Sequence, residues 1–440
     1  MPDSANRHLL AIAAAVVMQA VMACRGSAAA FALIPPSVPV VARSRLLALG
    51  KLGSASARQP CSPRTAANGL DRFRICSSAS DESAGSSDKA RVVFLGTPDV
   101  AAASLRSIVE ESRKDGSPFE VVGVVTQPPK RRKRRGKEIP SPVGLVAEEL
   151  EISVLCPEKA RDPDFLDELE GEVRPDLCIT AAYGQYLPKR FLAAPRLGTL
   201  NIHPSILPRW RGASPVQRSL QAGDDPIGVT VLFTVAKMDA GPIVAQEEYS
   251  VGADEQATTV LPHLFHVGTD LLLGAMPDVL SGKVSMDSAH QQDEDAVVNA
   301  SMIDSAEGQL IVWRDSATVC HNKCRGFSMW PGTFIYLQVG DDDPESADAD
   351  EPVRVKILKT RVVGEDEEGG GVVAPTNLIE MGPRKKDGLR IVCGDGSVLE
   401  VAQLQPATKK AMDAKSFVNG LRGQTVRWVK TPDPENEDDM

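Results

Sequence analysis

Between residues 89 and 285 the chain alternates short apolar runs with longer helical stretches. The apolar runs are rich in Val, Ile and Leu and end at Gly, Pro or Asp, which is typical of short buried strands. We predict strands at residues 91–95, 119–126, 153–155, 177–181, 199–203, 227–235 and 243–249. We predict helices at residues 98–110, 144–150 and 258–280. Alternating strands and helices indicate a parallel α/β sheet, in which ligands bind at the carboxyl ends of the strands.

A polar, acidic segment at residues 286–305 interrupts this pattern, and we interpret it as a linker. The chain then becomes rich in strand patterns, with apolar or alternating runs between Gly and Asp turns. We predict strands at residues 334–339, 353–358, 389–393 and 398–404, and helices at residues 316–327 and 412–421. Residues 306–430 are therefore expected to form a small β-barrel, with an acidic tail at residues 431–440. Two acidic runs, residues 341–351 and 365–368, are expected to be insertions in surface loops.

The composition is that of an ordinary soluble globular protein, with 42% hydrophobic and 25% charged residues. The longest apolar run, residues 9–23, is shorter than the ~18 or more residues of a membrane-spanning helix. We therefore expect a mature protein that does not associate with a membrane, and we expect it to act as a monomer.

The first 88 residues differ in charge from the rest of the chain. They hold nine Lys and Arg against five Asp and Glu, a net +4, which leaves −14 for the remainder of a chain of net charge −10. An apolar stretch at residues 9–23 is followed by small residues and then by Phe31. This two-part arrangement resembles the presequences of proteins sent to plastids bounded by extra membranes. We predict that residues 1–88 are a disordered targeting presequence, with a plastid as the destination and a mitochondrion as the alternative.

The eight cysteines are scattered, and most show no spacing typical of metal sites or disulfides. One group, Cys320, His321 and Cys324, could bind zinc, but it places three ligands on one predicted helix with no fourth nearby. We expect a reduced chain without a metal.

The predicted strand at residues 199–203 carries an amide and an imidazole two positions apart, Asn201 and His203. Residues i and i+2 of a strand point to the same face, so both side chains are expected to project together. An amide donor beside an imidazole suits acyl transfer, because the amide can stabilise a developing oxyanion while the imidazole handles a proton. A structural histidine is the alternative interpretation of this pair alone.

The residues around this pair extend the pattern, since residues 201–212 read Asn-Ile-His-Pro-Ser-Ile-Leu-Pro-Arg-Trp-Arg-Gly. This stretch resembles the signature of the folate-dependent formyltransferase family. Further stretches resemble the family in order and spacing: residues 94–99, 126–128, 140–143, 182–188, 238–241, 327–332, 394–396 and 404–412. The resemblance implies a doubly wound, Rossmann-like catalytic domain at residues 89–285 and an OB-fold-like barrel that binds tRNA at residues 306–430.

The resemblance also implies an activity and a set of site residues. Asn201, His203 and Asp239 correspond to the catalytic residues of the family, with 10-formyltetrahydrofolate as the co-substrate and no metal. The folate is expected to bind at Gln185, Tyr186, Leu187 and Met238. The second domain resembles the branch of the family that formylates the α-amine of methionyl-tRNA, which implies a role in starting organellar translation.

Lys130–Lys137 form the strongest basic run of the chain, with seven positive charges in eight residues. A nuclear-localisation signal or a solvated loop is the alternative interpretation of such a run. Its place after a predicted strand, at the rim of the expected site, matches the family's insertion loop that enters the tRNA acceptor stem. The residues predicted to contact tRNA are Arg131, Arg132, Arg134, Arg135, Lys137, Lys409 and Lys410, with Lys323 and Arg325 as further basic groups. The linker lacks the lysine that family members often carry there.

Two rival functions follow from the same residues. One is another formyltransferase-fold enzyme that acts on a small amine, either glycinamide ribotide or an amino sugar. The other is a non-catalytic tRNA-binding protein. The basic run and the second domain disfavour the first rival, and the presence of Asn201, His203 and Asp239 together disfavours the second, because a binding protein needs none of them.

Overall fold

The computed structural model describes residues 89–131, 136–340 and 351–431. The predicted presequence, the centre of the basic run, most of the first acidic insertion and the acidic tail lie outside these described residues. Within the described ranges, no helix combines the length and the hydropathy that crossing a bilayer requires.

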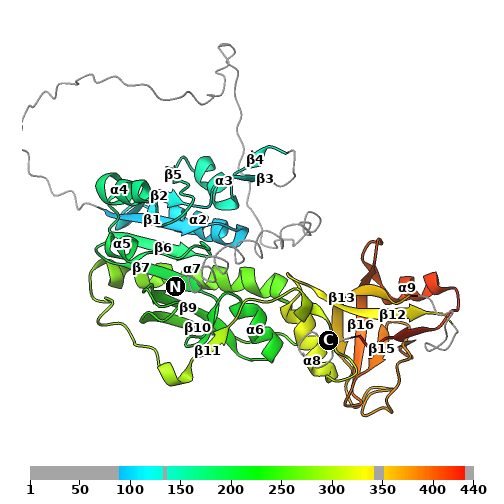
Figure 1. Cartoon of the computed structure of the whole chain (residues 1–440). Coiled ribbons are helices and arrows are strands. Elements are labelled where there is room, and N and C mark those ends of the chain that lie inside the picture. The colour runs from blue at the N-terminus through cyan, green and yellow to red at the C-terminus, as the bar shows by residue number, and fades with distance from the viewer. Residues whose placement is uncertain (1–88, 132–135, 341–350, 432–440) are drawn as a thin grey trace, which may run out of the picture. The chain divides into compact units, whose positions relative to one another are not determined.

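The first domain is built round a seven-stranded sheet (Figure 1). In space its strands follow the order β10-β9-β7-β6-β1-β2-β5. Their bounds are β1 Ala90–Gly96, β2 Phe119–Val125, β5 Val154–Leu155, β6 Leu177–Ala181, β7 Thr199–His203, β9 Ile227–Phe233 and β10 Ile243–Tyr249. The chain builds outward from β1 in one direction through β2 and β5, and then in the other through β6 and β7. The carboxyl ends of β1 and β6 therefore flank a switch point, where open α/β sheets bind their ligands.

The sheet is mixed, whereas the sequence pattern predicted a parallel one. β1, β2, β5, β6 and β7 are parallel, but β9 pairs antiparallel with β7 and with β10. Only a short turn at residues 234–242 joins β9 to β10. A parallel pair needs a crossover of about a dozen residues or more, so this connection permits only an antiparallel partner.

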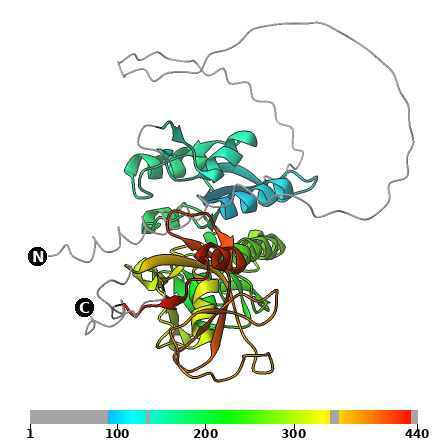
Figure 2. The same ribbon diagram turned by 90° about the vertical axis from the view of Figure 1, so that its right-hand side faces the viewer.

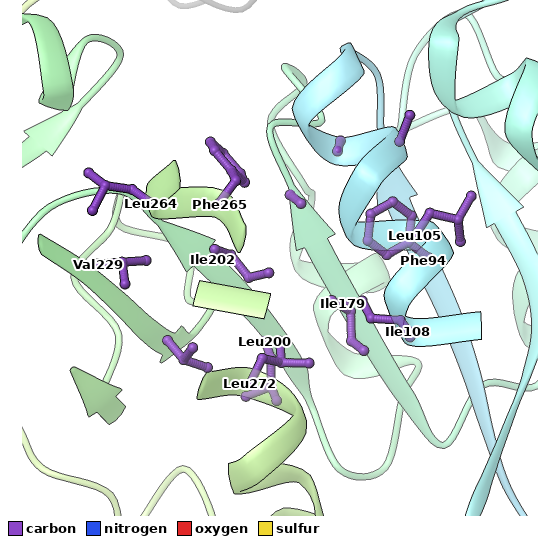
Figure 3. Packing of buried hydrophobic residues seen from close by; sticks show 14 of the residues in the cluster. Phe94, Leu105, Ile108, Ile179, Leu200, Ile202, Val229, Leu264, Phe265 and Leu272 are labelled. Carbon is purple, nitrogen blue, oxygen red and sulfur yellow. The ribbon is translucent and has the colours of Figure 1, made fainter. Parts of the chain in front are cut away.

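Helices cover both faces of the sheet, which confirms the doubly wound α/β class. On one face lie α2 Asp99–Ser112, α3 Pro142–Glu149, α6 Pro215–Ala222 and α7 Ala257–Leu280. On the other face lie α4 Pro163–Glu168, the π-turn Leu169–Val173 and α5 Lys189–Ala193. Figure 3 shows the first of these layers, where Leu105 and Ile108 of α2 and Leu264 and Leu272 of α7 pack over the strands.

One glycine allows α7 to approach the sheet closely. A Cβ atom on Gly268 would lie 2.6 Å from Cγ2 of Val229 and 2.7 Å from Cγ2 of Ile202. These distances are well inside van der Waals contact, so any larger residue would push the helix off the strands. Ile202 lies on β7 between Asn201 and His203, and this packing therefore supports the strand that carries the amide and the imidazole.

The second domain is an antiparallel sheet that curls into a barrel, as predicted; its strands run from yellow to red in Figure 2. Its strands are β12 Thr333–Val339, β13 Val353–Val362, β14 Glu380–Met381, β15 Leu389–Val392, β16 Val398–Pro406, β17 Met412–Asp413 and β18 Val426–Trp428. The chain before β14 closes the barrel on β18, because the amide of Ile379 donates to Val426 and that of Trp428 donates to Asn377. Two helices, α8 Ala317–Gly326 and α9 Ala414–Leu421, pack against its core.

The elements that the pattern missed are all short. They are the hairpin of β3 Lys130–Arg131 and β4 Glu138–Ile139, the pair of β8 Arg209–Gly212 and β11 Val298–Ala300, the barrel strands β14, β17 and β18, the helices α4, α5 and α6, and the turns η1 Leu169–Val173, η2 Glu294–Ala296 and η3 Ala306–Gly308. Runs of two to eight residues are too short to show an apolar period. Two of these elements, η2 and β11, lie in the predicted linker, which therefore has defined structure.

The second acidic run forms an ordered turn on the surface. Arg361 donates to both carboxylate oxygens of Glu367. These hydrogen bonds, together with one from the amide of Gly364, lower the pKa of Glu367 to about 2. The turn at residues 365–368 is therefore attached to β13 through Arg361.

Candidate active site

Asn201 and His203 lie together at the carboxyl end of β7, as the strand period predicts. β7 runs between β6 and β9, so both side chains are supported by strands on either side. Asn201 is half-buried, and His203 is buried with 5% of its surface exposed. They lie at the carboxyl edge of the sheet, the same edge as the switch point between β1 and β6.

Thr180, on the neighbouring strand β6, orients the amide of Asn201. The two residues are direct partners in the parallel ladder. The Thr180 hydroxyl donates to Oδ1 of Asn201 at 2.8 Å, with the carbonyl of Leu200 as a second acceptor at 3.1 Å. Because the amide oxygen is engaged, the Asn201 Nδ2 group is the part left to donate into the site.

His203 is held between a backbone carbonyl and a carboxylate. Its Nε2 lies 3.0 Å from the carbonyl oxygen of Trp210. A carbonyl oxygen can only accept, so Nε2 carries a proton and donates to it. The other ring nitrogen, Nδ1, lies 3.8 Å from Oδ2 of Asp239. That separation exceeds a hydrogen bond, and the pair is an electrostatic contact in this structure.

Asp239 reaches the site from the turn between β9 and β10. Its Oδ2 accepts a hydrogen bond from the amide of Gly212 at 2.9 Å, and the same atom faces His203. Asp239 has a φ of +48°, in the left-handed region that Asp tolerates better than most residues. The turn thus aims the carboxylate back across the strand ends, and the three residues predicted from sequence do come together.

We expect Thr180→Val to lower the turnover number about tenfold, since one orienting hydrogen bond is worth about 0.5–1.5 kcal/mol. The substitution keeps the shape of the side chain and removes only the hydroxyl. Thr234→Val is the matched control, because the Thr234 hydroxyl is buried without a hydrogen-bond partner in the described structure. Steady-state kinetics on both variants test the effect, and equal turnover in the two would show that Thr180 does not orient Asn201.

The four residues predicted to bind folate lie on two loops that approach each other. The hydroxyl of Tyr186 donates to the carbonyl of Ala236 at 3.4 Å, which joins the loop after β6 to the turn that carries Met238. Tyr186 and Met238 are 56% and 49% exposed, large values for apolar side chains. Leu187 is buried. The side chain of Gln185 is hydrogen-bonded to the backbone at residues 158–160, through its oxygen and one N–H group.

The described part of the basic run forms the start and end of a hairpin at the same edge of the sheet. Arg131 pairs with Glu138 across β3 and β4, and the side chains of Lys130, Arg131 and Lys137 are exposed. The predicted contacts Arg132, Arg134 and Arg135 lie outside the described residues. In the barrel, Lys409 and Lys410 are exposed on the turn after β16.

Two further basic groups do not lie where RNA could reach them. Lys323 and Arg325 on α8 are 4% and 8% exposed. Arg325 donates to the carbonyl oxygens of Glu255 and Gly252. The sequence interpretation of these two residues as tRNA contacts was wrong, because α8 turns this face towards the protein and hydrogen bonds replace the water that a surface cation would keep.

The side chains of the possible zinc site on α8 make other contacts within the protein. Both ring nitrogens of His321 are engaged, with the Thr360 hydroxyl at 2.9 Å and the Ala253 carbonyl at 3.0 Å. Burial lowers the pKa of this imidazole, and burial raises the pKa of Cys324. Across the described residues, no three His, Cys, Asp or Glu side chains form a group that could hold a metal ion.

Several groups that shape the site were not among the sequence predictions. Thr180 could have been found from the pairing of β6 with β7, but that pairing is not encoded locally. The carbonyl of Trp210 and the amide of Gly212 are main-chain groups, and no side-chain pattern indicates them. Trp210 has a φ of +65° and Gly212 a φ of +130°, so an unusual backbone turns these groups towards His203 and Asp239.

Comparison with known proteins covers both domains. Residues 90–276 match the family model described as formyl transferase, and residues 303–422 match the model described as formyl transferase, C-terminal domain. The chain is 33% identical over 334 residues to the methionyl-tRNA formyltransferase of Citrifermentans bemidjiense. The aligned region covers 76% of this chain and 94% of that protein. It is 34% identical over 330 residues to the methionyl-tRNA formyltransferase of Listeria monocytogenes, covering 75% and 95%. The crystal structure of an N-formyltransferase from Helicobacter canadensis superposes with a TM-score of 0.49 at 15% identity, covering 72% and 99%.

An α/β sheet with an amide, an imidazole and a carboxylate at its carboxyl edge, followed by an antiparallel barrel, defines a two-domain enzyme of the acyl-transfer class. The matches identify the family, because they cover both domains in order. The chain belongs to the formyl transferase family, as the residues around Asn201 predicted.

Proposed function

We propose that this protein transfers the formyl group of 10-formyltetrahydrofolate to the α-amine of methionyl-tRNA. The observation that carries the proposal is the meeting of Asn201, His203 and Asp239 at one edge of the sheet. They meet in a chain that is 33–34% identical to methionyl-tRNA formyltransferases along nearly their whole length. The activity needs both the chemistry at this edge and a surface that holds tRNA.

The reaction forms a bond from the amine nitrogen to the formyl carbon and breaks the bond from that carbon to N10 of tetrahydrofolate. Negative charge grows on the formyl oxygen as the amine attacks. Asn201 donates to this oxygen from Nδ2, which the hydrogen bond from Thr180 leaves free. We assign His203 to the same charge: its Nε2–H, which donates to the carbonyl of Trp210 in this structure, has to turn to the formyl oxygen, while Asp239 faces the other ring nitrogen. The attacking amine loses one proton and the departing nitrogen gains one, so the protons balance.

The exposed side chains beside the catalytic residues fit a folate. Tyr186 and Met238 present apolar surface to solvent on two loops joined by a hydrogen bond. A flat aromatic ring is the kind of ligand that such surface takes, while main-chain groups at Gln185 and Leu187 supply hydrogen bonds to its polar edge. The family's dependence on folate agrees with this assignment of Gln185, Tyr186, Leu187 and Met238.

The basic hairpin and the barrel suit the tRNA substrate. Lys130, Arg131 and Lys137 are exposed at the edge of the sheet where the catalytic residues lie. Cations there can bind acceptor-stem phosphates and bring the aminoacyl end to Asn201. Lys409 and Lys410 are exposed on the barrel and are the contacts that we assign to the second domain.

One assay separates this function from its rivals. The full chain is incubated with 10-formyltetrahydrofolate and one acceptor at a time: initiator methionyl-tRNA, glycinamide ribotide or a nucleotide-linked amino sugar. We expect formylation of methionyl-tRNA at a kcat/KM at least a hundredfold above either small amine. A preference for a small amine would replace the proposal by the rival enzyme, and tRNA binding without formylation of any acceptor would support the non-catalytic rival.

We further propose that residues 1–88 deliver the protein to a plastid, with the mitochondrion as the alternative. The support is the acid-free stretch from Ser4 to Leu70 and the small residues before Phe31. Fused to a fluorescent protein, residues 1–88 are expected to label the plastid of a heterokont cell. Phe31→Ala should divert the fusion, whereas Phe73→Ala in the same segment should not. Mitochondrial labelling would refute the plastid assignment.

A further inference from the structure

The segment between the two family domains contacts the catalytic turn directly. His290 and Ile243 exchange two backbone hydrogen bonds at the start of β10. Further along, β11 pairs in parallel with β8, the strand that contains Trp210 and Gly212. The segment therefore borders both β8, whose backbone contacts His203 and Asp239, and the end of the turn that carries Asp239.

Gln292, between these two attachments, binds the turn at Asp239 and at Gly241. Its Nε2 donates to the carbonyl oxygen of Asp239 at 2.8 Å and to that of Gly241 at 2.7 Å. An amide nitrogen has two N–H groups, so both are used on this turn. The backbone of the turn is thereby fixed at Asp239, whose carboxylate faces His203, and at Gly241.

Arg211 fixes the other end of the Gln292 amide. Its Nε and Nη2 donate to Oε1 of Gln292 at 2.9 and 2.7 Å, and its side chain is only 4% exposed. Nη1 of Arg211 donates to Glu294, and Glu294 in turn pairs with Lys237, two residues before Asp239. The hydrogen bond from Lys237, and after it the one from Arg211, lowers the pKa of Glu294. The Glu294 carboxylate therefore stays charged in this hydrogen-bond network.

A backbone hydrogen bond from Phe233 to Pro242 closes the turn at its base, but the backbone around Asp239 is held more weakly. Asp239 lies in the left-handed region, which costs most residues about 1–2 kcal/mol and which Asp adopts less readily than glycine. Within the turn, the amide of Ala240 reaches the carbonyl of Lys237 at 3.3 Å, longer than a typical backbone bond. The amide of Gly212 binds the Asp239 carboxylate itself, and side chains from outside the turn help to keep the backbone that carries it in place.

We propose that Gln292 is a positioning residue for Asp239, clamped by Arg211 and Glu294, so that the segment between the domains helps to build the active site. This inference rests on the proposed function, in which Asp239 orients His203. It gives residues 291–295 a role in the chemical step that their polar, acidic composition does not suggest.

The test replaces one amide by a carboxylate. Gln292→Glu keeps the size and still accepts from Arg211, but it cannot donate to the two carbonyls of the turn. We expect kcat for formyl transfer to fall at least tenfold while KM for methionyl-tRNA stays within about twofold, since both hydrogen bonds are removed at a distance from the tRNA. Gln291→Glu is the matched control. It makes the same charge change at the neighbouring residue, whose amide has only two long contacts, both at 3.5 Å, with backbone carbonyls. Equal losses in the two variants would overturn the proposal.

A double-mutant cycle separates positioning from a merely structural role. If Gln292 acts through Asp239, adding Gln292→Glu to Asp239→Asn should lower kcat by less than a further twofold, because the carboxylate it positions is already gone. Two losses that simply multiply would show that Gln292 acts elsewhere. Thermal unfolding of each variant shows whether the loss comes from misfolding.

Hydrogen exchange distinguishes a failure of this inference from a failure of the proposed function. The full-length wild type is first tested for formylation, and no formylation of methionyl-tRNA would refute the function. The amides of residues 237–241 are then compared between wild type and Gln292→Glu, whatever the acceptor. Faster exchange in the variant supports the positioning role, and unchanged exchange overturns it.

Discussion

Replacing Asn201 with alanine should lower the turnover number for formyl transfer by about 10²–10³, the typical cost of losing one donor to an oxyanion. The substitution removes the only part of this residue that Thr180 leaves free to donate into the site. KM for methionyl-tRNA and the unfolding temperature should change little, because Asn201 is half-buried rather than enclosed in the core. Steady-state and single-turnover rates measure the effect.

The control for this prediction is Asn377→Ala in the barrel, a half-buried asparagine outside the proposed site. It should keep wild-type turnover. An Asn201→Ala variant within about threefold of wild type would remove the oxyanion assignment, and with it the proposed role of Thr180.

His203→Ala should cost turnover to a similar extent, but it also removes the hydrogen bond to the carbonyl of Trp210. His203→Gln separates the two effects, because its amide can still donate to that carbonyl while it cannot carry an imidazole's proton. We expect both variants to be equally inactive, and only His203→Ala to unfold at a lower temperature. His266→Ala, an exposed histidine on α7, is the control.

Removing four arginines from the basic run at residues 130–137 should weaken tRNA binding and leave folate binding unchanged. The variant replaces Arg131, Arg132, Arg134 and Arg135 by Ala. If these side chains bind phosphates, the slope of log affinity against log salt should shrink by up to ~0.9 for each phosphate that is no longer neutralised on a duplex stem. Affinity for 10-formyltetrahydrofolate should not move, because a run of cations is too polar to line a pterin pocket. Binding and formylation rates against salt concentration, with initiator and elongator methionyl-tRNA, measure both effects.

A charge-matched control removes four cations from the opposite edge of the sheet. Lys89, Arg113, Lys114 and Arg174 are exposed and precede the amino ends of β1, β2 and β6. Their replacement should alter the salt slope much less than the four-arginine variant does. Equal slopes for the two variants would mean that the basic run acts only through net charge. A single arginine variant that loses more turnover than binding would mark a side chain that also shapes the acceptor end.

The sequence alone determined most of the large elements. β6, β7 and β10 have the predicted bounds, and α7 differs from its prediction by one residue. Local periodicity carries this information, because a buried strand or a long amphipathic helix repeats its pattern over several residues. The same period of two is sufficient to place Asn201 and His203 on one face of β7.

Tertiary structure decided how those elements and residues meet. Three contacts join parts of the chain that are far apart in sequence. They are the antiparallel pairing of β9 with β7, the hydrogen bond from Thr180 to Asn201, and the contact of Gln292 with Asp239, 53 residues away. The burial of Lys323 and Arg325 also depends on what α8 packs against, and their charges alone suggested the opposite. A sequence pattern describes a residue's neighbours along the chain. Hydrogen-bond partners and burial are set by neighbours in space, and for this site those come from several strands, two turns and the segment after α7.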